Sequence, residues 1–285
     1  MKAAIFPNFN KKNALSCAQE VCAMLRSCGA EALMDISCTE LFGEDENIHF
    51  GIFAEFLSQA DIAVAIGGDG TILRCANKIV ESGIPLLGIN TGRLGFMSSI
   101  ESTELDFLPE IIKGNYRVDS RMLLKIGLVR ADGNSEAFTA LNEVFIGSSF
   151  SKLVDFELFS DGKAIVSCRA DGVVLSTPTG STAYAFSAGG PIIEPSLQCI
   201  EFAQVCPHSL FSRAMLFSPD KRLELRFNPH RAPEMYFSID GAPPRRLLPD
   251  EYIEVTRSEH TIGLIDVKGA SFYDSVDRKL MKPLK

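Results

Sequence analysis

A glycine-rich turn interrupts two apolar segments at residues 67–71. The turn, Gly67-Gly68-Asp69-Gly70-Thr71, separates the almost wholly apolar run 61–66 from a segment of helical spacing at 72–80. Glycines allow a phosphate to approach the backbone closely, and the N–H groups at the start of a helix, which Thr71 could cap, point toward an anion. Gly67, Gly68 and Thr71 are therefore candidate phosphate-binding residues.

Asp69 is the unusual member of this turn. A carboxylate among phosphate-binding groups repels an anion unless it holds a metal or takes a proton. We therefore expect Asp69 to be catalytic. The alternative is that Asp69 is merely the N-cap of the following helix.

Two further polar clusters follow apolar stretches. In Asn90-Thr91-Gly92-Arg93-Leu94-Gly95-Phe96, the Asn and Arg side chains could bind a ribose or a phosphate, although a plain strand-to-loop turn is the alternative. Asn142 offers a donor and an acceptor that suit the edge of a base, and Glu143 accepts from hydroxyls such as those of a ribose. A solvated pair in a loop is the alternative for these two residues.

The densest signal is the run from Asp171 to Tyr184. Hydroxyl side chains occupy five of the seven positions from 176 to 182. Hydroxyl and backbone N–H donors in such a turn can bind a nucleotide without a net positive charge, and Tyr184 could pack on a ring. Ser, Thr, Pro and Gly also favour a tight turn between strands, which is the alternative.

Several common catalytic signatures are missing. Neither a P-loop motif nor a G-x-G-x-x-G turn after a strand occurs, which argues against a P-loop nucleotidase and the usual dinucleotide turn. The four histidines are scattered and no G-x-S-x-G exists, so the sequence does not favour Ser-His hydrolase chemistry. The eight cysteines suit neither a zinc site nor a disulfide framework. We interpret them as small buried residues of a protein in a reducing cytoplasm.

The elements that must position these residues alternate in type over the first hundred residues. The order β-α-β-α-β predicts an open parallel sheet with helices on both faces, which binds ligands at the carboxyl ends of its strands. The predicted strands are Ala3–Phe6, Ala32–Ile36, Asp61–Ile66 and Ile84–Ile89, and the predicted helices are 13–26 and 72–80. The acidic stretch Glu40–Asn47 is expected to be a surface loop.

After about residue 100 the pattern changes to short runs rich in Val, Ile, Leu and Phe. Turn pairs such as Asp132-Gly133 and Asp240-Gly241 separate the runs. The runs are Leu123–Val129, Glu143–Ile146, Phe156–Phe159, Ala164–Cys168, Leu223–Phe227, Met235–Ile239 and Tyr252–Thr256. This pattern predicts an all-β second domain.

The composition limits the partners of the protein. Of its 285 residues, 46% are apolar and 22% are charged, with a net charge of −8. An acidic chain is a poor binder of nucleic acid or of an anionic membrane, which both need a broad basic surface. No apolar run approaches the roughly 20 residues that span a bilayer, and the segment 1–7 is too short to be a secretory signal. Positive charge for an anionic substrate must therefore be local or come from a metal.

Taken together and in this order, the motifs resemble those of the NAD kinase family. The glycine-rich turn alone is shared with lipid kinases and 6-phosphofructokinases, whereas the run Ser176–Tyr184 is far more specific. The resemblance covers Gly67–Thr71, Asn90–Phe96, Leu141–Glu143, Asp171–Pro191, Pro207-His208 with Arg213, and Leu264-Ile265 with Ser271–Tyr273.

The resemblance implies transfer of the γ-phosphate of ATP to the adenosine-ribose 2′-hydroxyl of NAD, which gives NADP. Asp69 would be the general base, and Gly70 and Arg74 would lie beside the phosphates. Mg²⁺ or another divalent metal would be carried with ATP, because an acidic protein with few basic site residues must neutralise the phosphates.

The resemblance also implies which residues bind the dinucleotide. Asn142 would hold the adenine and Glu143 the ribose. Lys152, Arg169 and Asp171 match further substrate contacts, some of them from a neighbouring subunit. The residues implied to line the adenosine pocket are Thr182, Ala183, Tyr184 and Ser187.

The resemblance also implies two domains and an oligomer. An α/β nucleotide-binding domain would comprise residues 1–100 plus 262–285, since the C-terminal tail returns to it, and a β-sandwich NAD-binding domain would comprise residues 101–261. A cytoplasmic homodimer or homotetramer is expected. Ala242 stands where the family often has Gln, which puts one polar substrate contact in doubt.

Two other functions stay open from the sequence. One is a non-catalytic sensor that binds NAD(P), and the other is a lipid or sugar kinase of the same superfamily. The intact Asp69 argues against the sensor, and the lack of an evident apolar or basic membrane-facing patch argues against a lipid kinase.

Overall fold

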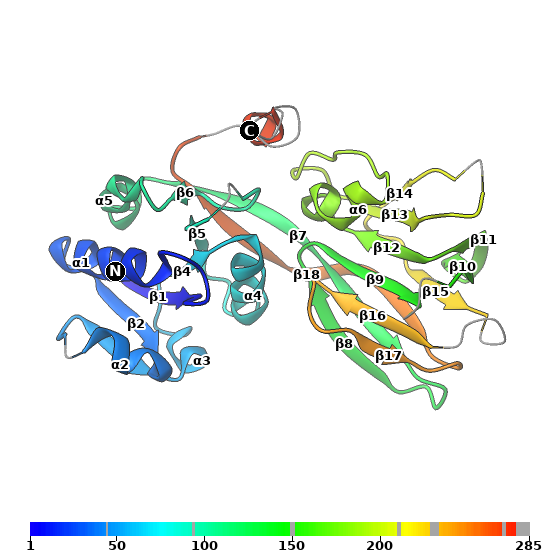
Figure 1. The fold of residues 1–285 in the computed structure, drawn as a ribbon, viewed down its shortest axis with the longest axis horizontal. Helices are drawn as coiled ribbons and strands as arrows, with labels where there is room; N and C mark the ends of the chain where they lie inside the picture. The colour runs from blue at the N-terminus through cyan, green and yellow to red at the C-terminus, as the bar shows by residue number, and fades with distance from the viewer. Residues whose placement is uncertain are drawn as a thin grey trace. The chain divides into compact units, whose positions relative to one another are not determined.

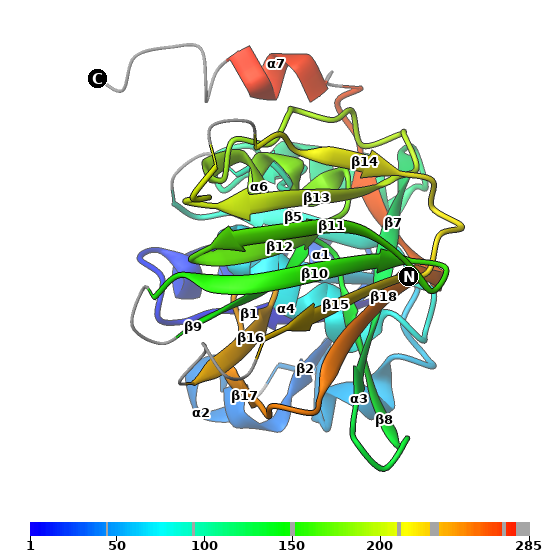
Figure 2. The same cartoon turned by 90° about the vertical axis from the view of Figure 1, so that its right-hand side faces the viewer.

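The computed structural model describes residues 1–43, 45–92, 95–148, 152–209, 212–228, 234–269 and 272–277. The chain divides into two compact units, one of residues Met1–Ser120 with His260–Lys285 and one of residues Arg121–Glu259. Strands β7 (Arg117–Val129) and β18 (Tyr252–Asp266) carry the chain from one unit to the other. Figures 1 and 2 show the elements of each unit from two directions.

The first unit is built on a parallel sheet with the strand order β3-β2-β1-β4-β5. All neighbours in this order are parallel, as predicted. Its other strands are β1 (Lys2–Pro7), β2 (Glu31–Asp35), β3 (Ile48–Gly51), β4 (Ile62–Gly67), β5 (Leu86–Asn90) and β6 (Ile100–Glu101). Its helices are α1 (Ala14–Ser27), η1 (Ile36–Cys38), α2 (Thr39–Phe42), α3 (Phe53–Phe56), α4 (Asp69–Ile79), η2 (Leu105–Phe107), α5 (Leu108–Ile112) and α7 (Phe272–Val276).

Helices cover both faces of this sheet. The strands β4 and β5 are buried along their whole length, which explains their continuous apolar runs. Val64 and Leu87 belong to a core cluster that also holds the inner side of α1. Gly88 follows Leu87 and faces the other way, where Ile72 of α4 lies so close that a Cβ at Gly88 would overlap it.

The C-terminal tail returns to the first unit, as the resemblance implied. The last part of β18 pairs in parallel with β5, with Leu264 opposite Leu86. The Ser99 hydroxyl donates to the carbonyl oxygen of Ile265, which is buried in the core of this unit. The compact units divide at residues 120 and 260 rather than at 100 and 262, because η2 and α5 pack on the same core as α1.

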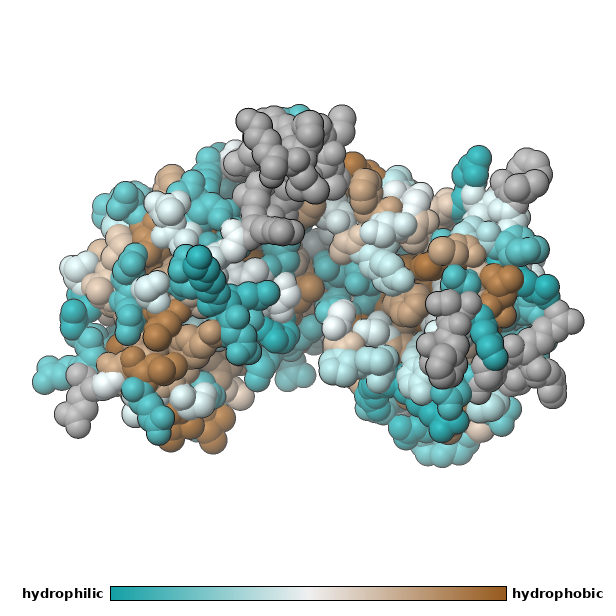
Figure 3. Space-filling view, viewed as in Figure 1, coloured by the Kyte–Doolittle hydropathy of each residue, from teal (hydrophilic) through white to brown (hydrophobic). Residues whose placement is uncertain are grey.

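The acidic stretch at 40–47 is partly helical, so the expectation of a surface loop holds for only part of it. Helix α2 begins at Thr39, whose hydroxyl donates to the carbonyl oxygen of Ile36 at 2.7 Å. Large apolar side chains are exposed nearby, with Ile36 at 63%, Leu41 at 42% and Ile52 at 56%. Figure 3 shows apolar surface over the part of the first unit that holds α2 and α3.

The second unit is a sandwich of two sheets. One has the order β14-β13-β12-β9-β16-β17. The other contains β11-β10-β15-β18, with β7 beside β18 and β8 beside β7. Its strands besides β7 and β18 are β8 (Ser135–Ala140), β9 (Glu143–Ser148), β10 (Val154–Ser160), β11 (Lys163–Ala170), β12 (Gly172–Ser176), β13 (Ile200–Val205), β14 (Met215–Phe217), β15 (Leu223–Phe227), β16 (Met235–Ile239) and β17 (Arg245–Leu247). Each β-rich run of the sequence lies within one strand of the two sheets.

One hydrophobic core lies between the two sheets. Val144 of β9, Leu175 of β12 and Phe202 of β13 stand opposite one another in register and enter this core. Side chains alternate along a strand, so the residues next to these three point to the opposite face of the sheet. That opposite face carries a row of three polar residues in register, Glu143, Ser176 and Glu201.

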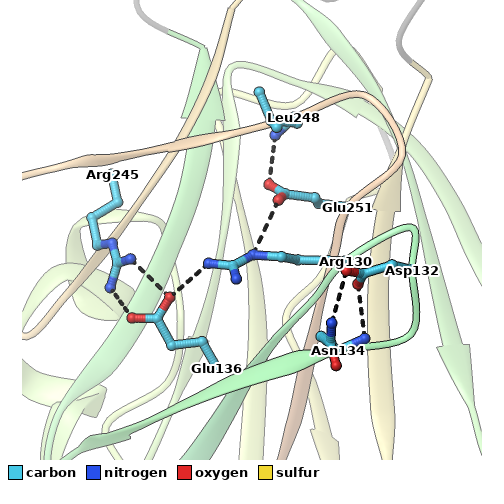
Figure 4. A network of polar contacts seen from close by, with 7 residues as sticks. All are labelled: Arg130, Asp132, Asn134, Glu136, Arg245, Leu248 and Glu251. Carbon is cyan, nitrogen blue, oxygen red and sulfur yellow. Dashed lines mark hydrogen bonds and ion pairs between the residues drawn. The ribbon is translucent and has the colours of Figure 1, made fainter.

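An ion-pair network ties the β7–β8 hairpin to β17 (Figure 4). Arg245 donates to both carboxylate oxygens of Glu136, at 2.8 and 3.0 Å. Arg130 also bonds Glu136 at 3.0 Å and lies 3.7 Å from Glu251, which accepts from the Leu248 N–H at 2.8 Å. These ion pairs hold the β7–β8 hairpin beside β17.

No helix in the described part of the chain is long and apolar enough to cross a membrane.

Candidate active site

The glycine-rich turn lies where β4 ends and α4 begins. Helix α4 starts at Asp69, so the N-cap position belongs to Gly68, whose backbone is extended. The interpretation of Asp69 as the N-cap is therefore wrong. Thr71 does not cap the helix either, because it lies inside α4 and its hydroxyl oxygen accepts from the Asn8 amide at 3.0 Å. Gly67 is needed here, since a Cβ on it would overlap the Thr71 side chain.

The Asp69 carboxylate bonds to the loop after β5 rather than to its own helix. The N–H of Phe96 donates to one carboxylate oxygen at 2.9 Å, and the N–H of Met97 donates to the other at 3.3 Å. The motifs Gly67–Thr71 and Asn90–Phe96, which are separated in the sequence by residues 72–89, are thus joined in the first unit. Arg93 and Leu94 of the second motif, and Ser271 near the C-terminus, lie outside the described residues.

The start of α4 is accessible. Asp69 is half-buried, whereas Gly70 and Arg74, one turn further along, are exposed. Arg74 forms no ion pair with any residue that the structure describes. A helix N-terminus attracts anions through its N–H groups and dipole, and a guanidinium in the next turn adds a full positive charge. This end of α4 can therefore hold a phosphate.

Asn142 and Glu143 stand at the start of β9 in the second unit and are almost fully buried. The Asp240 carboxylate holds them, because it accepts the N–H groups of Leu141, Asn142 and Glu143 at 2.9, 2.8 and 3.1 Å. The side-chain oxygen of Asn142 and one carboxylate oxygen of Glu143 are nevertheless buried without a hydrogen-bond partner among the described residues. Buried polar atoms are rarely left unpaired, so this pair indicates a binding site for a polar ligand. The interpretation as a solvated loop pair is wrong.

The environment of Glu143 favours its neutral form. Burial, together with the nearby charge of Asp240, raises the pKa of its carboxyl from 4.5 to about 8. A hydrogen bond from the Tyr184 backbone N–H acts in the opposite direction. A protonated Glu143 can donate a hydrogen bond as well as accept one, which suits a hydroxyl ligand.

The hydroxyl-rich run forms η3 (Thr179–Thr182) and α6 (Tyr184–Ser187) after β12. Three of its hydroxyls are buried and bond backbone atoms rather than face a ligand. Ser176 donates to the Asn142 carbonyl oxygen at 3.2 Å, and Thr177 donates to that of Leu141 at 2.5 Å. Ser181 donates to the Pro178 carbonyl oxygen at 2.7 Å. These three side chains build the turn and fasten it to β9, so the turn interpretation holds for them.

The residues after them are accessible. Thr182 and Ala183 are half-buried, and Tyr184 and Ser187 are exposed. The Tyr184 ring packs on Phe145 with the centroids 5.2 Å apart. Burial raises the pKa of the Tyr184 phenol, and charges at Cys206, Glu143 and Asp171 raise it further. Tyr184 thus lies near Glu143, which accepts its backbone N–H. Asp171 precedes Gly172, which is paired with Gly147 at the other end of β9, so the register does not bring Asp171 beside Glu143.

Lys152 and Arg169 are placed differently. Lys152 is exposed, and its backbone N–H and carbonyl oxygen both bond the Ser148 hydroxyl at 3.0 Å. Arg169 donates twice to Asp155, at 2.6 and 3.1 Å. Within the described residues, no hydrogen bond or ion pair joins either side chain to Asn142 or Glu143. Their roles in substrate binding stay predictions.

Sequence reasoning missed Asp240 and Glu201. Asp240 was interpreted as part of a turn and as the first residue of the motif Asp240-Gly241-Ala242, without a role of its own. Its backbone is left-handed (φ 49°), a conformation that Asp adopts more readily than most residues. Glu201 is fully buried on the same sheet face as Glu143, with neither carboxylate oxygen bonded to a described residue. Gly190 packs against it, since a Cβ there would overlap the carboxylate. Burial raises the pKa of Glu201 to about 7.

Family models match both units. The model for the ATP-NAD kinase N-terminal domain matches residues 3–116, and the model for the ATP-NAD kinase C-terminal domain matches residues 141–267. The chain is 34% identical over 281 residues to an NAD kinase from Caldanaerobacter subterraneus, with 98% of each chain covered. It is 36% identical over 262 residues to one from Thiobacillus denitrificans, covering 90% of this chain and 88% of that one.

The chain belongs to the NAD kinase family. The matched ranges include the turn around Asp69 in the first unit and the residues around Asn142, Tyr184 and Asp240 in the second.

Two solved structures of NAD(H) kinases share the fold. The yeast NADH kinase, crystallised with NADH, superimposes with a TM-score of 0.89 at 24% identity, covering 100% of this chain and 89% of that one. The Archaeoglobus fulgidus NAD kinase, in complex with ATP, has a TM-score of 0.73 at 24% identity, with 99% of each chain covered. The α/β unit followed by an antiparallel β unit is therefore the fold of this family.

Proposed function

We propose that this protein is an NAD kinase that transfers the γ-phosphate of ATP to the 2′-hydroxyl of the adenosine ribose of NAD. The observation that carries the proposal is the match to NAD kinases along 98% of the chain. The groups described in each unit have the chemistry that this reaction needs. They comprise an anion-attracting helix end with a carboxylate, and a buried amide–carboxyl pair in which one oxygen of each side chain has no partner among the described residues.

Asp69 is the proposed general base. A ribose hydroxyl is a weak nucleophile, and a carboxylate within hydrogen-bond reach takes its proton as the oxygen attacks. The 2′ oxygen forms a bond to the γ-phosphorus while the bond from that phosphorus to the leaving oxygen of ADP breaks. A carboxylate offers about four acceptor positions, so bonds to the N–H groups of Phe96 and Met97 are compatible with this role.

The second unit is proposed to bind the adenosine part of NAD. The amide of Asn142 can donate to and accept from the edge of a base, and Glu143 can bond the ribose hydroxyls. Tyr184 offers an exposed ring on a firm support, Phe145. Thr182, Ala183 and Ser187 belong to the same segment as Tyr184, and Asp171 precedes β12. We propose these four residues as further adenosine contacts.

Gly67, Gly68, Gly70, Thr71 and Arg74 are proposed to lie beside the phosphates. Among the described residues, no group of three or more His, Cys, Asp or Glu side chains could hold a metal ion. The N–H groups and the guanidinium at the start of α4 can bind phosphate oxygens but not a metal ion. A divalent metal here would therefore be bound mainly by phosphate oxygens and water. We therefore propose that Mg²⁺ enters with ATP as part of the donor substrate, where it neutralises phosphate charge.

The proposal is tested by a turnover assay with NAD, ATP and Mg²⁺, in which an NADP-specific dehydrogenase reports the product. Asp69→Asn should lower kcat by roughly 10²–10⁴-fold, the range for loss of a general base, and leave the affinity for NAD within about twofold. Asp220→Asn is the matched control, because Asp220 is an exposed carboxylate that pairs with Arg257 at 3.0 Å. Near-normal kcat in Asp69→Asn would contradict the base assignment.

Other outcomes separate the alternatives. Folded protein that binds NAD but forms no NADP, with ATP or with inorganic polyphosphate as donor, would support a dinucleotide sensor. Consumption of ATP that depends on an added lipid or sugar, and not on NAD, would support another kinase of the superfamily. The same assay with NADH in place of NAD determines which dinucleotide is preferred.

We further propose that the protein is a cytoplasmic homodimer or homotetramer, on the strength of its family. Light scattering coupled to gel filtration measures the mass directly, for comparison with the 31.1 kDa chain. A monomer at the concentration of the activity assay would contradict the proposal.

A further inference from the structure

The contact between Asp69 and the loop after β5 depends on a residue without a side chain. Gly95 immediately precedes the two N–H donors, Phe96 and Met97, and its Cα faces the Asp69 carboxylate. A Cβ on Gly95 would overlap one carboxylate oxygen and would crowd the carboxyl carbon at 2.9 Å. The space that a side chain would take is thus occupied by the proposed base.

The backbone of Gly95 does not itself need a glycine. Its φ lies outside the left-handed region, unlike that of nine other glycines in the chain. Any L-residue could therefore adopt this backbone without strain. The need for glycine arises from the close approach of the carboxylate and not from the conformation of the loop.

The described residues at the two ends of this loop are bonded to the sheet. At its start, the Thr91 N–H donates to the Gly67 carbonyl oxygen at 3.1 Å, and the Asn90 amide donates to Glu101 at 2.7 Å. At its end, the Ser99 N–H donates to the Gly88 carbonyl oxygen at 2.9 Å. Because residues 90–91 and 99 are fastened to the sheet and the N–H groups of Phe96 and Met97 bond the carboxylate, we expect a side chain at residue 95 to displace the carboxylate.

We infer that Gly95 is a positioning residue, which lets the loop N–H groups hold the Asp69 carboxylate in the orientation needed to take a proton. The inference rests on the proposed role of Asp69 as the base. One N–H fixes each carboxylate oxygen, so the plane of the carboxylate is set by the loop. Proton transfer needs the base within hydrogen-bond reach, and a displacement of about 1 Å can cost about 10²-fold in rate.

The test is a double-mutant cycle in kcat between Gly95→Ala and Asp69→Asn. Gly95→Ala should lower kcat about 10- to 100-fold with KM for NAD and ATP within twofold, because only the base moves. In the Asp69→Asn background the same substitution should have no further effect on kcat, since the base is already lost. Gly127→Ala on β7 is the control, because a Cβ there meets nothing closer than the Glu254 Cβ at 3.6 Å.

Thermal unfolding provides a second cycle that needs no activity. Gly95→Ala should lower Tm in the wild-type background and should have little effect in an Asp69→Ala background, where the carboxylate no longer fills the space. This cycle keeps the inference testable if Gly95→Ala alone folds poorly.

The outcomes are distinct. Unchanged kcat in Gly95→Ala, or a loss that multiplies with that of Asp69→Asn, would overturn the positioning role and leave the proposed base in place. An equal fall in Tm in both backgrounds would also overturn it. Near-normal kcat in Asp69→Asn alone would overturn the proposed base, and the positioning role with it.

Discussion

At the scale of single residues, buried carboxyl groups distinguish the site face of the second unit. Glu143 and Glu201 lie on opposite sides of Ser176 in one cross-strand row. Both are buried, and burial favours the neutral form of a carboxyl group, so the pKa of each is raised, to about 8 and about 7. These two carboxyl groups therefore stay protonated at pH values where exposed carboxyl groups are ionised.

The raised pKa of Glu201 predicts a dependence of stability on pH. Below pH 4.5 the folded and unfolded forms are both protonated. As the pH rises from 4.5 to about 7, only the unfolded chain loses the proton, so the free energy of unfolding falls. Above about pH 7 the loss is complete. The same reasoning applies to Glu143 up to about pH 8.

Glu201→Gln should remove its part of this fall. We expect the decrease in unfolding free energy between pH 5 and pH 8 to shrink by on the order of 2–3 kcal/mol, since a tenfold change in proton affinity corresponds to about 1.4 kcal/mol. Urea unfolding at the two pH values measures it. Glu157→Gln, an exposed carboxylate on β10, is the control. Equal pH dependence in Glu201→Gln and the wild type would show that Glu201 does not hold the proton.

At the scale of elements, one carboxylate joins two strands of the site. Strand β16 pairs antiparallel with β9, and Asp240 directly follows β16. Its carboxylate accepts three N–H groups at the start of β9, while its own N–H donates to the Glu143 carbonyl oxygen at 3.0 Å. The conformation of the Asn142-Glu143 pair is therefore set by an element from the far end of the unit's sequence.

Asp240→Ala should destabilise the second unit by about 2–4 kcal/mol, because three N–H groups lose a charged acceptor. KM for NAD should rise as Asn142 and Glu143 lose their orientation. Asp240→Asn should recover about half of the stability, since its amide oxygen still accepts and Asn tolerates the left-handed backbone. Denaturant unfolding and NAD titration measure both effects. Equal losses in the two variants would contradict a role for the carboxylate oxygens.

At the scale of the whole molecule, the chain leaves the first unit in β7 and returns to it in β18. Residues 260–266 bring Ile262, Leu264 and Ile265 into buried positions of the first unit. The strand β5 pairs with β4 on one side and with β18 at Leu264. The first unit is therefore complete only when the C-terminal segment has been added.

A chain that ends at residue 259 should fail to fold its first unit. It would lack a strand next to β5 and three buried apolar side chains, each worth about 1.5–3 kcal/mol when buried. Limited proteolysis should digest residues 1–120 at least tenfold faster than in the full chain. A chain that ends at residue 277 keeps β18 and is the control. A protease-resistant fragment of residues 1–120 from the shorter chain would contradict the prediction.

The sequence by itself determined the elements and the motifs. Apolar periodicity identified β1, β2, β4 and β5 of the first unit and the β-rich runs of the second, because both patterns record which side of each element is buried. It did not identify the short edge strand β3. The Gly67–Thr71 turn and the run to Tyr184 identified the family, since close backbone approach and tight turns need particular residue types at fixed spacing.

Only the tertiary structure decided the partners of the site residues. Asp69 bonds a backbone N–H 27 positions away, and Asp240 bonds one 97 positions away. Such contacts depend on which strands become neighbours in a sheet, and local patterns do not specify strand order. For the same reason, nothing in the sequence around Glu201 showed that its carboxyl group would be buried beside Gly190. The types of the site residues follow from local chemistry, whereas their partners and their burial follow from the packing of strands that are far apart in the sequence.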